Sequence, residues 1–295
     1  MSESTKPMAF TGERFTPECV REIWYEHWHR YAFALPLVSG RRVLDAACGE
    51  GYGSALLARH AASVVGVDIS PQAIEHARLR YGGASNLRFD TGDAAALEFQ
   101  DASFDIVVSF ETLEHLEAQQ ALVAGFARVL ADDGLLLISS PDKRSYSDHA
   151  GFRNEFHVRE LYREELLELL SPHFPHVRLY AQKLLFQSIL WRLDGEMAPS
   201  AVATAAADGA EVATTLDYVP LYYVAACSRR PLPVDLPGLS LFGDREESVY
   251  AHYNGEVRKN MSAGARIAEL EAELEAARRA PIVAQAPWWR RWLGR

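Results

Sequence analysis

The chain has 295 residues, of which 48% are hydrophobic and 24% charged, which is the composition of an ordinary globular protein of one or two domains. Forty Asp and Glu side chains against 30 Lys and Arg give a formal net charge of −10. This counts against a nucleic-acid polymer as the main partner, because such binders usually carry a basic face. The three cysteines, Cys19, Cys48 and Cys227, form no C-x-x-C pair, so we expect a reducing compartment and neither a disulfide scaffold nor a structural zinc site.

The first 40 residues contain no apolar stretch of signal-peptide length, and no run of 18 apolar residues occurs in the chain, so we expect a cytoplasmic protein. Aromatic and histidine side chains are concentrated between Trp24 and Phe33, in a segment that should be mostly helical. The segment from Gly12 through this aromatic stretch to Tyr31, and the loop at 142–154, are interpreted as a lid over a binding site, and packing of the helices onto the core is the alternative. The candidate substrate-binding side chains in these two segments are Glu13, Arg14, Arg153 and Asn154.

From residue 42 onward, short apolar runs alternate with segments of helical periodicity. The runs lack polar alternation, as expected for strands of a parallel sheet covered on both faces. We expect strands at 42–47, 63–68, 86–91, 104–110, 134–140, 176–183 and 218–228, with a loop in the Ala/Thr-rich stretch 197–215. This repetition predicts the α/β class, with a doubly wound, seven-stranded sheet of the Rossmann type. The expected organisation is an N-terminal helical lid (1–40), the α/β domain (41–230), a linker (231–260), a short coiled coil (261–280) and a Trp/Arg tail (281–295).

A glycine-rich loop follows the first expected strand, in the sequence Asp45-Ala-Ala-Cys-Gly49-Glu-Gly51-Tyr-Gly53. Glycines at such a place let backbone amides approach a ligand at a helix N-terminus. The spacing is G-x-G-x-G rather than the G-x-G-x-x-G that cradles a pyrophosphate, which disfavours an NAD-binding oxidoreductase. Asp68 ends the second strand, where it can accept ribose hydroxyls, and Asp93 follows the third, where it can receive an adenine amino group.

Over roughly residues 40–230 this pattern resembles the class I S-adenosylmethionine-dependent methyltransferases. The resemblance implies S-adenosylmethionine as the cofactor, with Asp45 holding its amino-acid part and the loop glycines forming a backbone cradle. It also implies that Asp68 binds the ribose and Asp93 the adenine edge, with Ile69 and Ala94 packed around the ring. The expected cofactor-binding residues are Asp45, Gly49, Gly51, Gly53, Asp68, Ile69, Asp93, Ala94 and Phe110.

The motif Glu111-Thr-Leu-Glu114-His115 follows the fourth expected strand directly. If a helix starts near Glu111, the two carboxylates and the imidazole share one face, at the edge of the sheet where ligands bind. The alternative is a solvated helix face, with the glutamates favoured by the helix dipole. E-x-x-E-H at this position resembles the small-RNA 2′-O-methyltransferases and the polyprenyl-dihydroxybenzoate O-methyltransferases of ubiquinone biosynthesis. That resemblance implies a divalent metal bound by these three side chains.

A downstream histidine completes the metal site in the RNA enzymes. Here we expect His157, directly before a helix at 158–170, to be the fourth ligand, with His149 in reserve. Mg²⁺ or Mn²⁺ is the expected ion, and the donor set also allows Zn²⁺, Ni²⁺ or Co²⁺. The candidate catalytic residues are His115, His149 and His157, of which one that is not bound to the metal would take the hydroxyl proton.

The acceptor that suits such a site is a vicinal diol, found in a sugar, an RNA terminus or a catechol. The sequence G-E-R-F-x-P at 12–17 and the block Y-S-D…N-x-F-H-x-R-E-L at 146–161 resemble bacterial methyltransferases of surface-polysaccharide (O-antigen) synthesis. This implies metal-assisted O-methylation of a glycan hydroxyl, which at the non-reducing end would block chain extension. The alternatives are a quinone-precursor or RNA 2′-O-methyltransferase, or a non-catalytic cofactor-binding scaffold for a glycosyltransferase.

Beyond the α/β domain, Ala263, Ile267, Leu270, Leu274 and Ala277 follow the 4-3-4-3 spacing of a coiled-coil seam, which is a route to homo-oligomers. The last 15 residues contain three arginines, three tryptophans and no acidic residue. Such a segment suits contact with an anionic inner-membrane surface or with a partner such as a glycosyltransferase, and a disordered tail is the alternative.

Overall fold

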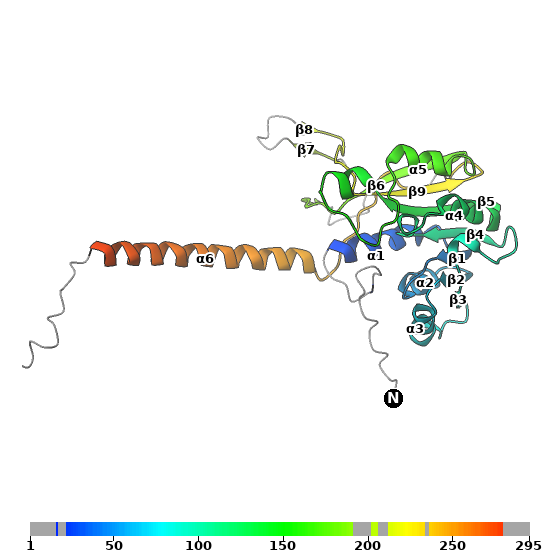
Figure 1. Cartoon of the computed structure of the whole chain (residues 1–295), viewed down its shortest axis with the longest axis horizontal. Helices are drawn as coiled ribbons and strands as arrows, with labels where there is room; N and C mark the ends of the chain where they lie inside the picture. Colours follow the sequence, from blue (N-terminus) through cyan, green and yellow to red (C-terminus); the bar gives the residue numbers. More distant parts are fainter. Residues whose placement is uncertain (1–15, 17–21, 191–201, 206–211, 234–235, 280–295) are drawn as a thin grey trace, which may run out of the picture. The chain divides into compact units, whose positions relative to one another are not determined.

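The computed structural model describes residues 16, 22–190, 202–205, 212–233 and 236–279. The chain divides into two compact units, residues 1–243 and 244–295. The first unit contains the sheet and its helices, and the second contains one long helix (Figure 1). Glu13, Arg14, Cys19 and the expected Trp/Arg tail lie outside the described residues.

The first unit is built on a seven-stranded sheet in the order β3-β2-β1-β4-β5-β9-β6 (Figure 1). The strands are β1 (Arg42–Ala46), β2 (Ser63–Asp68), β3 (Leu87–Thr91), β4 (Phe104–Ser109), β5 (Leu130–Pro141), β6 (His176–Gln182) and β9 (Tyr222–Ser228). β9 runs antiparallel to both β5 and β6, and the other neighbours are parallel, so the sheet is mixed. The prediction of seven strands is confirmed, although β5 begins four residues earlier than expected and β9 begins at Tyr222.

Helices cover both faces of this sheet, which confirms the doubly wound arrangement. One buried cluster joins the sheet to α4 (Gln119–Val129) and α5 (Arg163–Leu170). The other cluster joins it to α1 (Glu22–Ala34), α2 (Tyr52–Leu57) and α3 (Pro71–Tyr81). The buried strands carry almost no exposed side chains, which explains their uninterrupted Val, Ile and Leu runs.

The expectation of a helix beginning near Glu111 is wrong. Glu111 adopts a left-handed backbone with φ of 52°, which an α-helix does not accommodate, and a 3₁₀ turn (η2, Leu113–His115) follows it. Its N–H donates to Ser139 Oγ on β5 at 2.9 Å, so the chain turns across the end of the sheet before α4 begins at Gln119.

The helix expected at 158–170 begins only at Arg163. The N–H groups of Val158 and Arg159 donate to the carbonyl of Glu114, so this stretch is held by a distant loop and not by its own helical turn. A hydrogen bond marks the true start, where the Tyr162 N–H donates to the Glu165 carboxylate at 2.9 Å.

The second unit contains α6, one helix from Ser248 to Arg279. The expected linker at 231–260 is therefore shorter than predicted, because its last residues belong to this helix. In the Ala/Thr-rich stretch, β7 (Thr204–Ala205) pairs with β8 (Val212–Ala213). Among the described residues, no helix combines the length and apolar character needed to span a bilayer.

Candidate active site

A cavity of about 290 Å³ lies at the carboxyl ends of the central strands. Its walls come from the residues that follow β1, β2, β3 and β4, and from Ile23, His27 and Tyr31 on one face of α1. This is the edge at which sheets of this class bind ligands. Two further cavities of about 370 and 260 Å³ lie beside the opposite face of α1 and contain none of the motif residues.

Asp68 and Asp93 both line this cavity, each held by backbone N–H groups. The Asp68 carboxylate accepts from the N–H of Gly49 and from that of Ser70, both at 2.9 Å. Asp93 caps a short turn by accepting from the Ala95 N–H at 2.8 Å. Ile69, Ala94 and Phe110 line the same wall, as expected for an adenosine pocket.

The three loop glycines have different roles. Gly49 lines the cavity and has a left-handed backbone with φ of 56°. A Cβ on Gly51 would lie 2.8 Å from the Phe89 ring, and a Cβ on Gly53 would lie 2.0 Å from the Tyr31 ring. Gly51 and Gly53 are thus required for packing beneath the loop. Of the three glycines expected to form the cofactor cradle, only Gly49 lines the cavity.

Asp45 lies beneath the cavity wall and is almost fully buried. Its carboxylate accepts from Ser54 Oγ at 2.6 Å and from the Tyr31 hydroxyl at 3.1 Å. Burial raises the pKa of Asp45 to about 7, against the lowering effect of these two hydrogen bonds. Sequence reasoning missed Tyr31 and Ser54, because nothing in the local pattern connects them to Asp45.

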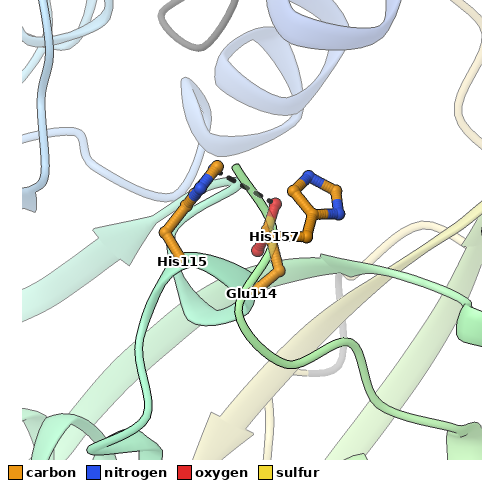
Figure 2. Close-up of side chains that lie close together, drawn as sticks. All are labelled: Glu114, His115 and His157. Atoms are coloured by element: carbon orange, nitrogen blue, oxygen red, sulfur yellow. Dashed lines mark ion pairs between the residues drawn. The ribbon is translucent and has the colours of Figure 1, made fainter. Parts of the chain in front are cut away.

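Glu114, His115 and His157 form a cluster whose potential ligand atoms all lie within 4.8 Å of one another (Figure 2). Glu114 is only 1% exposed, and its Oε2 has no hydrogen-bond partner. Its Oε1 lies 4.0 Å from His115 Nε2. A buried carboxylate oxygen without a hydrogen bond is costly, and burial together with the nearby charge of Glu111 raises the pKa of Glu114 well above its usual range. A divalent cation would compensate this buried charge, so the cluster fits a metal ion.

Hydrogen bonds also orient the imidazoles of His115 and His157 in a way that fits a metal ion. Nδ1 of His115 lies 2.9 Å from the Phe156 carbonyl oxygen, and Nδ1 of His157 lies 2.6 Å from Glu160 Oε1. These oxygens accept, so each Nδ1 carries the proton and each Nε2 keeps its lone pair. A ligating histidine is commonly held in this way by a carbonyl or a carboxylate.

Asn154 contacts the cluster from the loop before His157. Its Oδ1 accepts from the Phe156 N–H at 3.1 Å, which orients the Nδ2 group toward His157 Nε2 at 3.0 Å. A cation bound at that nitrogen would displace this hydrogen bond. Asn154 therefore contacts the cluster through His157. It was predicted to bind substrate, and it also lines the cavity.

Backbone contacts bring the two halves of the cluster together across 40 residues of sequence. The N–H groups of Val158 and Arg159 donate to the Glu114 carbonyl at 2.8 and 3.0 Å. The Gln119 side chain donates to the carbonyls of Leu113 and Arg159, at 2.9 and 2.8 Å. These bonds fix the loop after β5 against η2, which places His157 beside His115.

Glu111 lines the cavity but is not part of the cluster. Ser139 Oγ donates to its Oε1 at 2.7 Å, and Arg30 Nη2 lies 3.4 Å from the same atom. Arg30 is buried on α1, where its guanidinium lies 4.5 Å above the Tyr222 ring and Nε donates to Gln182 at 2.8 Å. The structure thus gathers three of the four expected ligands and pairs the fourth with an arginine that sequence reasoning missed.

Two other expected residues lie apart from the cavity. His149 and Arg153 are exposed, and neither is among the residues that line it. His27, Tyr146 and Tyr222 line it but were not singled out from the sequence. The Tyr146 ring stacks on His157 with centroids 5.2 Å apart, and burial together with the charge of Arg30 holds the pKa of His27 well below its usual range.

Comparison with known proteins agrees with this geometry. Residues 44–138 match the family described as "Methyltransferase domain". The chain is 39% identical over 166 residues to a probable S-adenosylmethionine-dependent methyltransferase of Mycobacterium tuberculosis, a match that covers 55% of this chain and 60% of the relative. It is also 39% identical over 106 residues to a ubiquinone biosynthesis O-methyltransferase of Xylella fastidiosa, covering 35% of this chain and 43% of the relative.

The crystal structure of the YcgJ protein from Bacillus subtilis superposes with a TM-score of 0.50 at 20% identity, covering 69% of this chain and all of that one. This likeness shows the fold alone. Residues 44–138 thus resemble a methyltransferase domain, and the sheet has the Rossmann-like fold of the class I methyltransferases. The chain spans less than two thirds of the length of the curated relatives described above.

Proposed function

We propose that the chain is an S-adenosylmethionine-dependent, divalent-metal-assisted O-methyltransferase that acts on a sugar hydroxyl of a bacterial surface polysaccharide. The observation that carries the proposal is the buried carboxylate of Glu114, whose Oε2 accepts no hydrogen bond, beside His115 and His157 and within the cavity that Gly49, Asp68 and Asp93 also line.

On the cofactor side, S-adenosylmethionine supplies a sulfonium methyl group to an attacking oxygen. Asp68 presents a carboxylate for the ribose hydroxyls, because the N–H groups of Gly49 and Ser70 fix its orientation. Asp93 lies at the end of the cavity where the adenine would bind, beside the apolar Ile69 and Ala94. Asp45 and Tyr31 support the loop from below.

On the acceptor side, a divalent cation supplies Lewis acidity, which lowers the pKa of a hydroxyl and makes it nucleophilic near neutral pH. Glu114, His115 and His157 would hold the ion, and Glu160 and the Phe156 carbonyl would keep the imidazoles in the ligating tautomer. Two imidazoles and one carboxylate suit Mn²⁺ better than Mg²⁺, because Mg²⁺ prefers oxygen ligands.

His27 is the residue placed to accept the hydroxyl proton. The Nε2 lone pairs of His115 and His157 belong to the metal cluster, and Glu111 is paired with Arg30. His27 lies on the same face of α1 as Tyr31, one turn away, and burial with the charge of Arg30 lowers its pKa, so the imidazole is neutral and keeps a ring lone pair. As the acceptor oxygen takes the methyl group, its proton passes to a ring nitrogen of His27.

The sugar assignment is supported by the sequence blocks at 12–17 and 146–161 and by the lining of the cavity. Tyr146 and Tyr222 provide aromatic faces, and Asn154 and His27 provide polar groups, a combination that suits a carbohydrate. The net charge of −10 argues against RNA. Partnership with a glycosyltransferase or with the cytoplasmic face of the inner membrane, and termination of chain growth, belong to the same proposal and are supported by the sequence of the Trp/Arg tail.

A quinone precursor is the second candidate acceptor. The observation in its favour is the 39% identity to the Xylella ubiquinone biosynthesis O-methyltransferase over 106 residues. A catechol also offers two adjacent oxygens to a cation, so the chemistry of the cluster suits either acceptor.

The variant Glu114→Gln tests the proposal, with Glu117→Gln, which alters an exposed carboxylate of the same loop, as the matched control. We expect Glu114→Gln to lose Mn²⁺ binding in calorimetry and methyl transfer to bacterial glycans, while its affinity for S-adenosylmethionine stays unchanged. Full activity of Glu114→Gln, or of the wild type in excess chelator, would refute the metal-assisted mechanism. Transfer to dihydroxybenzoates and not to glycans would favour the second candidate.

A further inference from the structure

The long helix α6 carries an apolar stripe that faces solvent. Ile267 is 56% exposed, Leu270 47% and Leu274 51%. In the described part of the second unit, residues 244–279, every side chain from Val257 onward is exposed. Three large apolar side chains at 3- and 4-residue spacing on a solvated helix are a surface to which another helix can bind.

The residue types along this stripe fit a two-stranded coiled coil. With Ile267 and Leu274 at heptad position a, Leu270 occupies position d, and Ala263 and Ala277 occupy the flanking d positions. Ile267 at a with Leu270 at d matches the pattern that favours two strands over three or four, whereas Leu274 at a does not contribute to this preference. Asn260 falls at the preceding a position, where a single polar residue fixes the register of a dimer.

The charged residues beside the apolar stripe determine whether two such helices pair parallel or antiparallel. Arg266 and Glu273 occupy position g, and Glu271 and Arg278 occupy position e. In a parallel, in-register pair, each g residue meets the e residue five positions further along the other copy. Arg266 then meets Glu271, and Glu273 meets Arg278, so symmetry gives four pairs of opposite charge.

An antiparallel pair has less of this complementarity, because its geometry sets g against g and e against e. The register that packs Leu270 against Leu274 of the other copy brings Glu271 and Glu273 opposite their own copies. The register that packs Ile267 against Leu270 sets Leu274 against Ala263 and pairs only Arg266 with Glu273, which gives two charge pairs instead of four. Like charges directly opposite are destabilising. Within the isolated helix Arg266 already pairs with Glu269 at 2.9 Å, an exposed contact that an interhelical partner can replace at little cost.

We propose that α6 binds the α6 helix of a second copy of this chain as a parallel, in-register, two-stranded coiled coil. The inference rests on the second unit alone and does not depend on the proposed function. Such a dimer ties two methyltransferase domains together, and both copies of the Trp/Arg sequence follow from the same end of the coiled coil. Two linked binding elements raise the avidity for a multivalent target such as an anionic surface or a long glycan.

The first test is the mass of the full chain in solution, measured by light scattering over a range of concentrations. We expect twice the monomer mass at high concentration, with dissociation on dilution because the apolar seam is short. Ile267→Asp should give the monomer at every concentration, and Ala265→Asp, on the opposite face of the helix, should remain dimeric. A monomeric wild type at the highest soluble concentration, or a threefold mass, overturns the proposal.

Direction and pairing are tested by charge exchange and by crosslinking. A variant with Arg266→Glu and Arg278→Glu, and another with Glu271→Arg and Glu273→Arg, should each be monomeric alone and should form a heterodimer when mixed. Leu270→Cys should form a disulfide with its own copy, while Ala265→Cys should not. Homodimers of either charge variant, or no Leu270→Cys crosslink in a dimeric protein, would overturn the parallel, in-register arrangement.

Discussion

Glu160 contacts the cluster of Glu114, His115 and His157 through His157, and its replacement tests whether the cluster is organised for a cation. Its Oε1 is 2.6 Å from His157 Nδ1, and the side chains of Glu160 and His157 are only 7% and 8% exposed. Glu160 does not itself belong to the group of potential ligands. It acts through His157, by holding the proton on Nδ1 and directing Nε2 toward the site.

The size of the effect follows from this geometry. Loss of such a supporting partner usually lowers metal affinity about 10- to 100-fold, which corresponds to about 1.4 to 2.7 kcal/mol. Glu160→Gln keeps an acceptor oxygen for the Nδ1–H but loses the negative charge, so we expect about a tenfold loss. Glu160→Ala leaves a buried N–H without that acceptor, so we expect a loss near 100-fold.

The assay is calorimetric titration of the full chain with Mn²⁺, with circular dichroism to confirm folding. Glu155→Gln provides the control, because Glu155 is an exposed carboxylate in the same loop. The affinity for S-adenosylmethionine should be equal in all four proteins. Unchanged Mn²⁺ affinity in folded Glu160→Ala, while the wild type binds the ion, would refute the supporting role of Glu160 and leave the metal site itself standing.

Three further substitutions test other parts of the site. Gly53→Ala places a Cβ 2.0 Å from the Tyr31 ring, so we expect a loss of about 1 to 3 kcal/mol in the free energy of unfolding and weaker cofactor binding, whereas Gly125→Ala in α4 should not destabilise the protein. Burial raises the pKa of Asp45 from 3.8 to about 7, so the native state holds a proton that the unfolded state releases. The unfolding free energy of the ligand-free protein, measured in urea, should therefore fall between about pH 4 and 7, and Asp45→Asn should reduce that slope; an identical slope would contradict this assignment. His27→Asn should lower kcat about 10²- to 10⁴-fold with both ligands still bound, and an effect on KM alone would argue against proton transfer to His27.

The fold could be predicted because its signals are local. Seven apolar runs without polar alternation identified the seven strands, since a strand covered on both faces needs apolar side chains on both. The reversal of β9 had no such signal, because a buried strand has the same composition in either direction. The helix expected at Glu111 failed for a related reason, since the left-handed turn at this residue depends on contacts with β5.

In the candidate site, too, residues with a local sequence signal were predicted, and contacts that depend on packing were not. Asp68, Asp93 and Gly49 were found from their places at strand ends, and the structure puts all three on one cavity wall. Gly53 was given to the cofactor because its spacing matched the motif, yet its absent side chain makes room for Tyr31. A motif records which residue types are needed, and only the packed structure shows what each one touches.

The sequence by itself determined the strand–helix order and the places of the glycine-rich loop and of Glu114 and His115 at strand ends, because each of these follows from spacing along one segment. The tertiary structure decided which candidates meet. His157 reaches His115 through backbone hydrogen bonds between loops about 40 residues apart, while Arg30 on α1 pairs with Glu111 and keeps it out of the cluster. Contacts of this kind depend on how distant segments pack, and local periodicity contains no information about them.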